Sequence, residues 1–180
     1  MISAGRILER RLRGTMRLFI AINLSEEMKE GLLEAQDAMI EMGVGGNYTR
    51  PENLHLTMAF IGEYGDPDLV KEVVESIDFA PFSLAFDGMG SFRNLWWAGV
   101  EKNDQLHRLA KRLRRALAEA GIPFDRKKFS PHITLIRRPD RPLDGEILEQ
   151  IDLGGGSMTV DHLSLMRSDR GKHGMIYTEL

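Results

Sequence analysis

The sequence predicts an α+β fold made of two related halves. Apolar residues recur every three or four positions in three long segments, as they do on the buried stripe of a helix. In other segments they alternate with polar residues, which is typical of strands with one buried face. Strands follow one another towards the carboxyl end, which argues against a purely parallel sheet. Each half contains helices and one strand with the same polar motif, which suggests an internal duplication.

The first half begins with a strand at residues 17–23, whose nearly continuous apolar character indicates a central position. Ser25 is suited to cap the helix that follows. A turn then leads into a strand that ends near Gly62. Asp66 and Pro67 supply a capping side chain and a proline at the first position of the next helix. The stripes expected to be buried are Met28, Leu32, Ala35, Met39 and Met42 in the first helix, and Leu69, Val73 and Ile77 in the second.

The second half repeats this alternation and closes with strands. We expect, in order, strands at 82–86 and 95–101, a helix from Asn103 or Asp104 to Gly121, a strand around Ile133, a short helical piece at 146–151, and an antiparallel pair at 159–167 and 175–180. Trp96 and Trp97 lie on opposite faces of their strand. One is therefore expected in the core, and the other either stacks on a base or covers the helix layer.

Two copies of a His-x-Thr motif carry the chemistry. His55 and Thr57 share one face of a strand whose other face is apolar, and His132 and Thr134 do the same on a distant strand. One such motif is explained equally well by a half-exposed strand histidine. Two in matching contexts predict that both strands face one cleft, which would then hold two imidazoles and two hydroxyls.

Composition limits the class of protein. The 180 residues suit one domain, which we place at 16–180. Residues 1–15 contain Arg6, Arg10, Arg11 and Arg13; we expect a dispensable extension, and the alternative is a basic arm that touches RNA. A net charge of −3 gives no global field that attracts nucleic acid. The absence of cysteine excludes disulfides and thiolate-bound metals and suits a cytoplasmic location. No apolar run has the length of a membrane span.

The one local concentration of basic residues precedes the second motif. Arg126, Lys127 and Lys128 lead directly into it, so they are candidate RNA contacts through phosphate attraction. The basic residues on the outer face of the preceding helix are better explained as a solvated surface.

Around these motifs the chain resembles the 2H phosphoesterase superfamily, and within it the RNA 2',3'-cyclic phosphodiesterases, also called 2'-5' RNA ligases. The resemblance covers residues 16–180. It is carried by residues 16–22, 53–57, 97–100 and 129–135, and by Ser168 and Tyr177 in the tail.

This resemblance implies two lobes related by a pseudo-twofold axis, with antiparallel sheets lining a central cleft and helices outside. It also implies opening of a 2',3'-cyclic phosphate to a 2'-phosphate without a metal or other cofactor. An arginine five positions after the second histidine contacts phosphate in the family, and Arg137 matches it. Strict alternation would point Arg137 away from His132, so the strand must end or bend before it.

Cyclic phosphate hydrolysis needs a base for water, an acid for the leaving oxygen, and donors for the charged phosphoryl oxygens. Imidazole suits both proton transfers near neutral pH. Following the family, we assign His132 as the base and His55 as the acid. Thr57 and Thr134 donate to phosphoryl oxygens, and Arg137 adds positive charge.

Other functions remain open at this stage. A metal hydrolase would need carboxylates or further histidines at ligand spacing, and none flanks either motif; His162, in an apolar stretch, is expected to be a structural strand residue. A non-catalytic nucleotide- or RNA-binding module would keep the cleft without the chemistry. Ligation of 2'-5' ends is the reverse reaction at the same site. We expect a monomer that acts on RNA or a nucleotide with a cyclic phosphate terminus, without a membrane partner.

Overall fold

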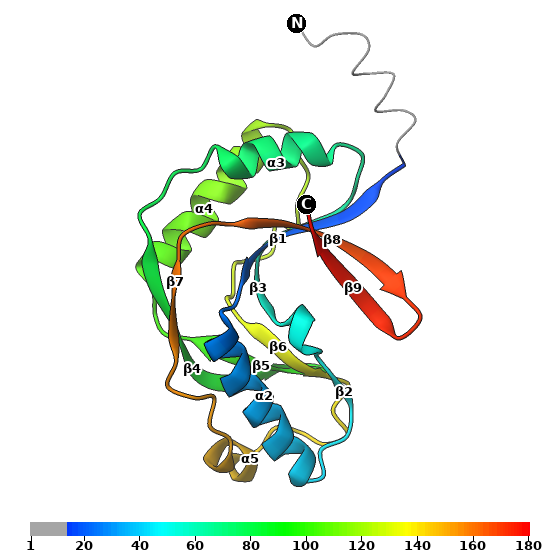
Figure 1. Cartoon of the computed structure of the whole chain (residues 1–180), viewed down its shortest axis with the longest axis vertical. Coiled ribbons are helices and arrows are strands. Elements are labelled where there is room, and N and C mark those ends of the chain that lie inside the picture. Colours follow the sequence, from blue (N-terminus) through cyan, green and yellow to red (C-terminus); the bar gives the residue numbers. More distant parts are fainter. Residues whose placement is uncertain (1–13) are drawn as a thin grey trace, which may run out of the picture.

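The computed structural model describes residues 14–180, and it confirms an α+β fold with two antiparallel sheets (Figure 1). The arginines expected in the extension lie outside these described residues. The strands are β1 (Met16–Asn23), β2 (Asn47–Tyr48), β3 (His55–Tyr64), β4 (Phe82–Phe92), β5 (Leu95–Val100), β6 (Ile133–Arg137), β7 (Ser157–Val160), β8 (Ser164–Gly171) and β9 (Gly174–Glu179). The helices are α2 (Glu26–Glu41), the 3-10 turn η1 (Pro51–Asn53), α3 (Pro67–Glu75), α4 (Asp104–Glu119) and α5 (Gly145–Gln150).

The three longer helices begin at the capping residues that the sequence indicates. The Ser25 hydroxyl accepts from the Met28 N–H at 3.3 Å, and the Asp66 carboxylate accepts from the Leu69 N–H at 3.2 Å. For α4 the cap is Asn103, whose side-chain oxygen accepts from a backbone N–H at 3.0 Å. Each bond satisfies one of the amides that a helix leaves free in its first turn.

The two sheets have the strand orders β3-β1-β8-β9 and β2-β6-β5-β4-β7. Helices α3 and α4 contact β8 and β3 of the first sheet, whereas α2 contacts β6 and β7 of the second. Figure 1 shows α3 and α4 at one end of the molecule and α2 and α5 at the other. Each lobe therefore combines segments from the beginning and the end of the chain, instead of being one contiguous half.

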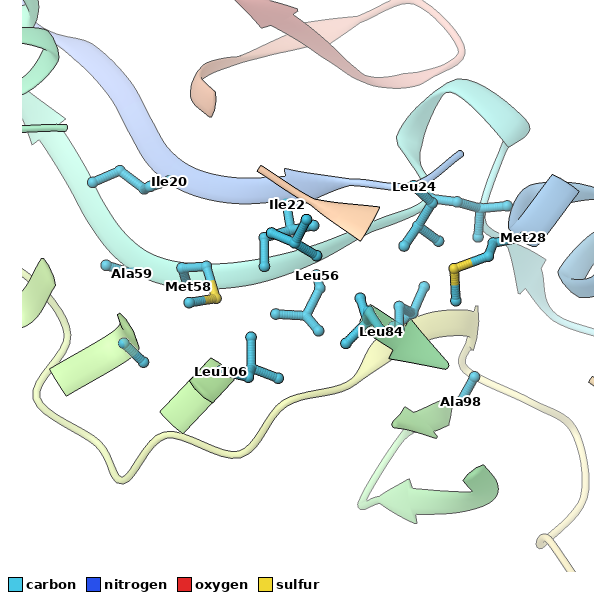
Figure 2. Packing of buried hydrophobic residues seen from close by; sticks show 14 of the residues in the cluster. Ile20, Ile22, Leu24, Met28, Leu56, Met58, Ala59, Leu84, Ala98 and Leu106 are labelled. Atoms are coloured by element: carbon cyan, nitrogen blue, oxygen red, sulfur yellow. The ribbon is translucent and has the colours of Figure 1, made fainter. Parts of the chain in front are cut away.

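One large core joins both sheets. Figure 2 shows Leu56 and Met58 of β3 close to Ile22 of β1, with Leu84 and Leu106 from the other strands and helices packed nearby. The opposite side of β1 is also covered, because Phe19 and Ala21 form a second small cluster with Met166, Phe60 and Tyr177. Burial on both faces explains why β1 is nearly all apolar, and its place between β3 and β8 confirms that it is central.

Three expectations were wrong in detail. The strand expected at 159–167 is two strands in different sheets, because the chain bends between β7 and β8. His162 lies in this bend, where its side chain is 71% exposed and pairs with Asp161 at 2.6 Å, so it is not a buried strand residue. On α3 the buried residues are Val70 and Val74, one position after the expected stripe, whose members Leu69, Val73 and Ile77 are partly buried against the core. Within residues 14–180, none of the helices has both the length and the apolar character that crossing a bilayer would require.

Candidate active site

His55 is the first residue of β3, directly after the turn η1. Its Nδ1 lies 2.7 Å from the carbonyl oxygen of Asn53. Because a carbonyl oxygen only accepts, Nδ1 carries the proton, and Nε2 is left as the reactive nitrogen of the neutral ring. The hydroxyl of Thr57 lies 2.9 Å from this Nε2. The rings of Phe19 and Tyr177 pack at 4.9 and 5.3 Å from the imidazole and at 4.9 Å from one another.

His132 directly precedes β6 and is held by the same device. Its Nδ1 lies 2.7 Å from the carbonyl oxygen of Ser130, two residues earlier, so its Nε2 is also free to react. The ring of Phe92 meets the imidazole edge-on at 5.0 Å, and Trp97 lies at 6.3 Å. Trp96 is in the core at 2% exposure. Trp97, on the other face of β5, therefore lies beside the motif histidine His132.

Both motifs open into one cleft between the sheets. Strands β3 and β6 belong to different sheets but contact one another. The cleft has a volume of about 1070 Å³. Its lining includes all five of the residues predicted to act on phosphate, namely His55, Thr57, His132, Thr134 and Arg137. The structure thus brings together two motifs that are far apart in the sequence.

A β-bulge explains how Arg137 reaches the cleft. Trp97 pairs with Thr134 and Trp96 pairs with Ile136, so Leu135 is an extra residue on β6. The extra residue shifts the alternation by one position. Leu135 and Ile136 are both fully buried, and Arg137 returns to the side of Thr134. The bend that the sequence required before Arg137 is this bulge.

The same irregularity follows the first motif. Ala21 pairs with Thr57 and Ile20 pairs with Ala59, so Met58 is the extra residue on β3. Met58 and Ala59 are buried, and Phe60 lines the cleft at the position that corresponds to Arg137. The two strands therefore share their geometry, but one presents a cation and the other an aromatic ring.

The cleft is electrostatically positive. Its lining includes four arginines, Arg17, Arg50, Arg137 and Arg170, and one acidic side chain, Glu63. Burial lowers the pKa of His55, the positive charges of Arg137 and His132 lower it further, and the hydrogen bond to Asn53 opposes them. The free protein therefore holds His55 mainly neutral at neutral pH.

Several cleft residues were not predicted from the sequence. Arg17 shares the cleft side of β1 with Phe19 and lies 4.9 Å from the centre of the Phe60 ring. Arg50 directly precedes the turn η1, and Arg170 and His173 come from the β8–β9 hairpin. The alternation of β1 could have indicated Arg17. Arg170 and His173 reach the cleft because of how the β8–β9 hairpin packs, which leaves no local signal in the sequence.

The basic trio before the second motif does not line the cleft. Arg126 lies over the ring of Phe124 at 4.8 Å, and the exposed Lys127 is 3.9 Å from Asp125. Lys128 is exposed on the same loop between α4 and β6. A role for Arg126, Lys127 and Lys128 in RNA contact stays a prediction, and any such contact would lie outside the cleft. In the described part of the chain, no three or more His, Asp or Glu side chains are arranged to hold a metal ion.

Comparison with known proteins agrees with this geometry. Residues 43–172 match the family model described as the 2'-5' RNA ligase superfamily. The chain is 34% identical to the RNA 2',3'-cyclic phosphodiesterase of Thermotoga maritima over 92% of this chain and 93% of that protein. The protein of the same name from Archaeoglobus fulgidus is 31% identical, over 92% and 98%.

Solved structures show the same architecture. The crystal structure of Escherichia coli LigT in apo form aligns with a TM-score of 0.78 and 27% identity, over 93% of this chain and 95% of that one. A structure from Thermus thermophilus aligns with a TM-score of 0.75 and 32% identity, over 92% and 95%. On the match to the family model and the identity to these relatives, the chain belongs to the 2'-5' RNA ligase superfamily.

Proposed function

We propose that this protein hydrolyses the 2',3'-cyclic phosphate at an RNA end to a 2'-phosphate. The observation that carries the proposal is the pair of imidazoles, each with Nδ1 engaged by a backbone carbonyl and Nε2 available at one cleft. Two such nitrogens can act on opposite sides of one phosphorus atom. The relatives named as RNA 2',3'-cyclic phosphodiesterases support this choice of substrate class.

In the proposed reaction, His132 Nε2 removes a proton from water while the water oxygen bonds to phosphorus. The bond from phosphorus to the ribose 3'-oxygen breaks, and that oxygen takes a proton from His55 Nε2. The products are a 2'-phosphate and a 3'-hydroxyl, and one water has been added. Each proton transfer contributes on the order of a hundredfold to ten-thousandfold to the rate. Solvent then restores the two protonation states.

The donors around the phosphate stabilise the charge that grows on its oxygens. The hydroxyls of Thr57 and Thr134 donate to the two non-bridging oxygens, and Arg137 supplies a guanidinium on the same side. A bound phosphate also changes His55. Its negative charge offsets the positive charges that lower the pKa of His55 in the free protein, so binding raises this pKa and favours the protonated form that an acid needs.

The size and charge of the cleft favour an RNA end over a mononucleotide. Small-molecule pockets have volumes of roughly 300–1,000 Å³, and this cleft, at about 1070 Å³, is at or above the upper limit. Arg50 and Arg170 line it in addition to Arg137, so further backbone phosphates find cations. Ligation of 2'-5' ends would use the same groups in reverse. Its extent would depend on the concentrations of the ends.

The test is an assay of chelator-treated protein on four substrates. These are RNA with a cyclic phosphate end, a 2',3'-cyclic mononucleotide, an ADP-ribose cyclic phosphate and a 2'-5' oligonucleotide. Phosphorus NMR identifies the position of the product phosphate. We expect fastest turnover of the RNA end and a 2'-phosphate product. Tight nucleotide binding without turnover would instead identify a binding module, and loss of activity with chelator would identify a metal enzyme.

A further inference from the structure

Two helix side chains reach the backbone directly beside the motifs. Gln36 lies ten residues after the first residue of α2, a helix of 16 residues, and is only 5% exposed. Its side-chain nitrogen donates to the carbonyl oxygens of Leu135 and Thr49, both at 2.9 Å. Leu135 is the extra residue of the bulge that turns Arg137 into the cleft, and Thr49 itself lines the cleft.

Arg114 occupies the equivalent position on α4. It also lies ten residues after the first residue of a 16-residue helix. Its Nε donates to the carbonyl oxygen of Met58 at 3.3 Å, and its Nη1 donates to that of Lys127 at 2.7 Å. Met58 is the extra residue of the bulge that follows Thr57. Lys127 belongs to the segment that leads to His132.

The two contacts are related by the pseudo-twofold symmetry. Each side chain joins the bulge after one motif to the segment that precedes the other. The backbone follows the same pattern, because the Thr49 N–H donates to the Leu135 carbonyl at 2.9 Å and the Asp125 N–H donates to the Phe60 carbonyl at 2.8 Å. A bulge interrupts the regular ladder of a sheet, and its buried carbonyl needs a donor from elsewhere.

We propose that Gln36 and Arg114 are positioning residues that hold the two bulges and thereby fix the cleft side chains of both motif strands. Gln36 fixes the direction of Arg137, and Arg114 fixes that of Thr57. Without the side-chain donors, the Leu135 carbonyl keeps only the Thr49 N–H, and the Met58 carbonyl loses its bond from Arg114. A bulge held by fewer hydrogen bonds can relax towards regular pairing, and a slip of one residue turns a side chain to the opposite face. The proposal rests on the proposed function only for the identity of the substrate, since it concerns the geometry of the phosphate site itself.

The first test is Gln36→Met, which keeps the length of the side chain and removes its donors. We expect Arg137 to leave the cleft side of β6. Inorganic phosphate should then bind roughly tenfold to hundredfold more weakly, the loss expected for one charge-assisted hydrogen bond. The pKa of His55 should rise, because Arg137 and His132 are the charges that lower it and one of them has moved. NMR titration of the imidazole protons measures both quantities.

A double variant separates positioning from general destabilisation. In an Arg137→Gln background, Gln36→Met should change neither phosphate affinity nor the pKa of His55 any further, although it still lowers thermal stability. The matched control is Met39→Ala, which removes a buried side chain from the same helix and keeps the hydrogen bonds from Gln36 to the Leu135 and Thr49 carbonyls. We expect it to lower stability and to leave both NMR quantities unchanged. Additive effects in the double variant, or the same changes in Met39→Ala, would overturn the proposal for Gln36.

Arg114→Lys tests the second position and does not depend on the folding of the Gln36 variants. Lysine keeps the charge but has one compact ammonium, which cannot reproduce the planar two-point contact of arginine. We expect kcat on the cyclic phosphate to fall by no more than in Thr57→Val, roughly two- to tenfold, with little change in phosphate affinity, because Gln36 still holds Arg137. Unchanged kcat in a protein that hydrolyses the substrate would contradict the role of Arg114. The NMR measurements require no turnover, so a failure of the proposed hydrolysis leaves the test of Gln36 intact.

Discussion

The two halves of the cleft share their construction and differ in what they present. In each half a histidine donates to a carbonyl two residues earlier at 2.7 Å, a threonine follows on the same face, and a bulge comes next. After the bulge the first half has Phe60 and the second has Arg137. His55 is enclosed by Phe19 and Tyr177, whereas His132 lies beside Phe92, which is 40% exposed.

The two halves therefore have the same backbone geometry, but the side chains around each histidine give the two imidazoles different environments. Two identical halves would give two imidazoles with the same pKa, and neither would be committed to one role. Here burial and nearby positive charge lower the pKa of His55. Pairs of titratable groups whose environments differ are those that can divide acid and base roles. The reaction that we propose requires such a division.

The largest effect is expected from the histidines themselves. Asparagine at either position keeps a donor near the place of Nδ1 and removes Nε2, so His55→Asn and His132→Asn should each lower kcat on the order of a hundredfold to ten-thousandfold. Binding of the product should change much less. A variant that keeps a tenth of the activity would contradict the paired roles.

A sulfur-bridged substrate assigns the two roles. If the 3'-oxygen is replaced by sulfur, the leaving thiolate needs no proton. The loss in His55→Ala should then become small, while the loss in His132→Ala should persist. The reverse pattern would exchange the assignments of acid and base. If each variant loses as much activity on the sulfur-bridged substrate as on the normal one, neither histidine protonates the leaving atom.

The next effect concerns the position where the halves differ most. Arg137→Gln should weaken phosphate binding roughly tenfold to hundredfold, as expected for a charge-assisted hydrogen bond. Arg137→Lys should recover only part of this, because lysine lacks the planar fork. Phe60→Leu is the matched control at the equivalent position and should change phosphate affinity little. Calorimetry with inorganic phosphate measures all three, and a loss in Phe60→Leu as large as in Arg137→Gln would remove the distinction between the halves.

The sequence predicted the two His-x-Thr motifs, the helix N-caps and the shared cleft, because each of these predictions starts from a local pattern of residues. Alternation placed each histidine and its threonine on one face, and Ser25, Asp66 and Asn103 marked the helix starts. The bulge after the first motif was missed, and the bulge after the second was anticipated only as an end or bend of the strand before Arg137. Two consecutive buried residues, Leu135 and Ile136, separate Thr134 from Arg137 and break the alternation.

Other features had no local signal. The β8–β9 hairpin brings Arg170 and His173 to the cleft only because β8 pairs with β1, at the opposite end of the sequence. The basic trio at 126–128 was predicted from its closeness to the second motif in sequence. The three side chains do not line the cleft, and the Lys127 side chain is 90% exposed. Their contact with RNA stays a prediction. Proximity along the chain did not imply proximity to the cleft.

The threonines should show a smaller and unequal effect. Valine keeps the shape of threonine and removes the hydroxyl, so each substitution should lower kcat by roughly two- to tenfold, the value of one neutral hydrogen bond. Thr57 must exchange its contact with His55 Nε2 for one with the phosphate. Among the hydrogen bonds of residues 14–180, Thr134 has no such contact to His132. Thr134→Val should therefore cost more than Thr57→Val, and steady-state kinetics of both variants on the same substrate decides this.

The smallest effect is on stability, and its sign follows from His55. Its pKa is lowered in the folded protein, so the unfolded chain binds this proton more tightly. The contribution of His55 to the free energy of unfolding is present in full above the pKa of histidine in the unfolded chain, near 6.5. It is lost as the pH falls through the lower pKa that His55 has in the folded protein. His55→Asn removes this group, so the decrease in Tm between pH 7.5 and about pH 5 should be smaller in the variant than in the parent protein. Thermal unfolding at several pH values measures it, with His162→Asn as the exposed control; an equal decrease in all three proteins would mean that burial of His55 does not shift its titration on folding.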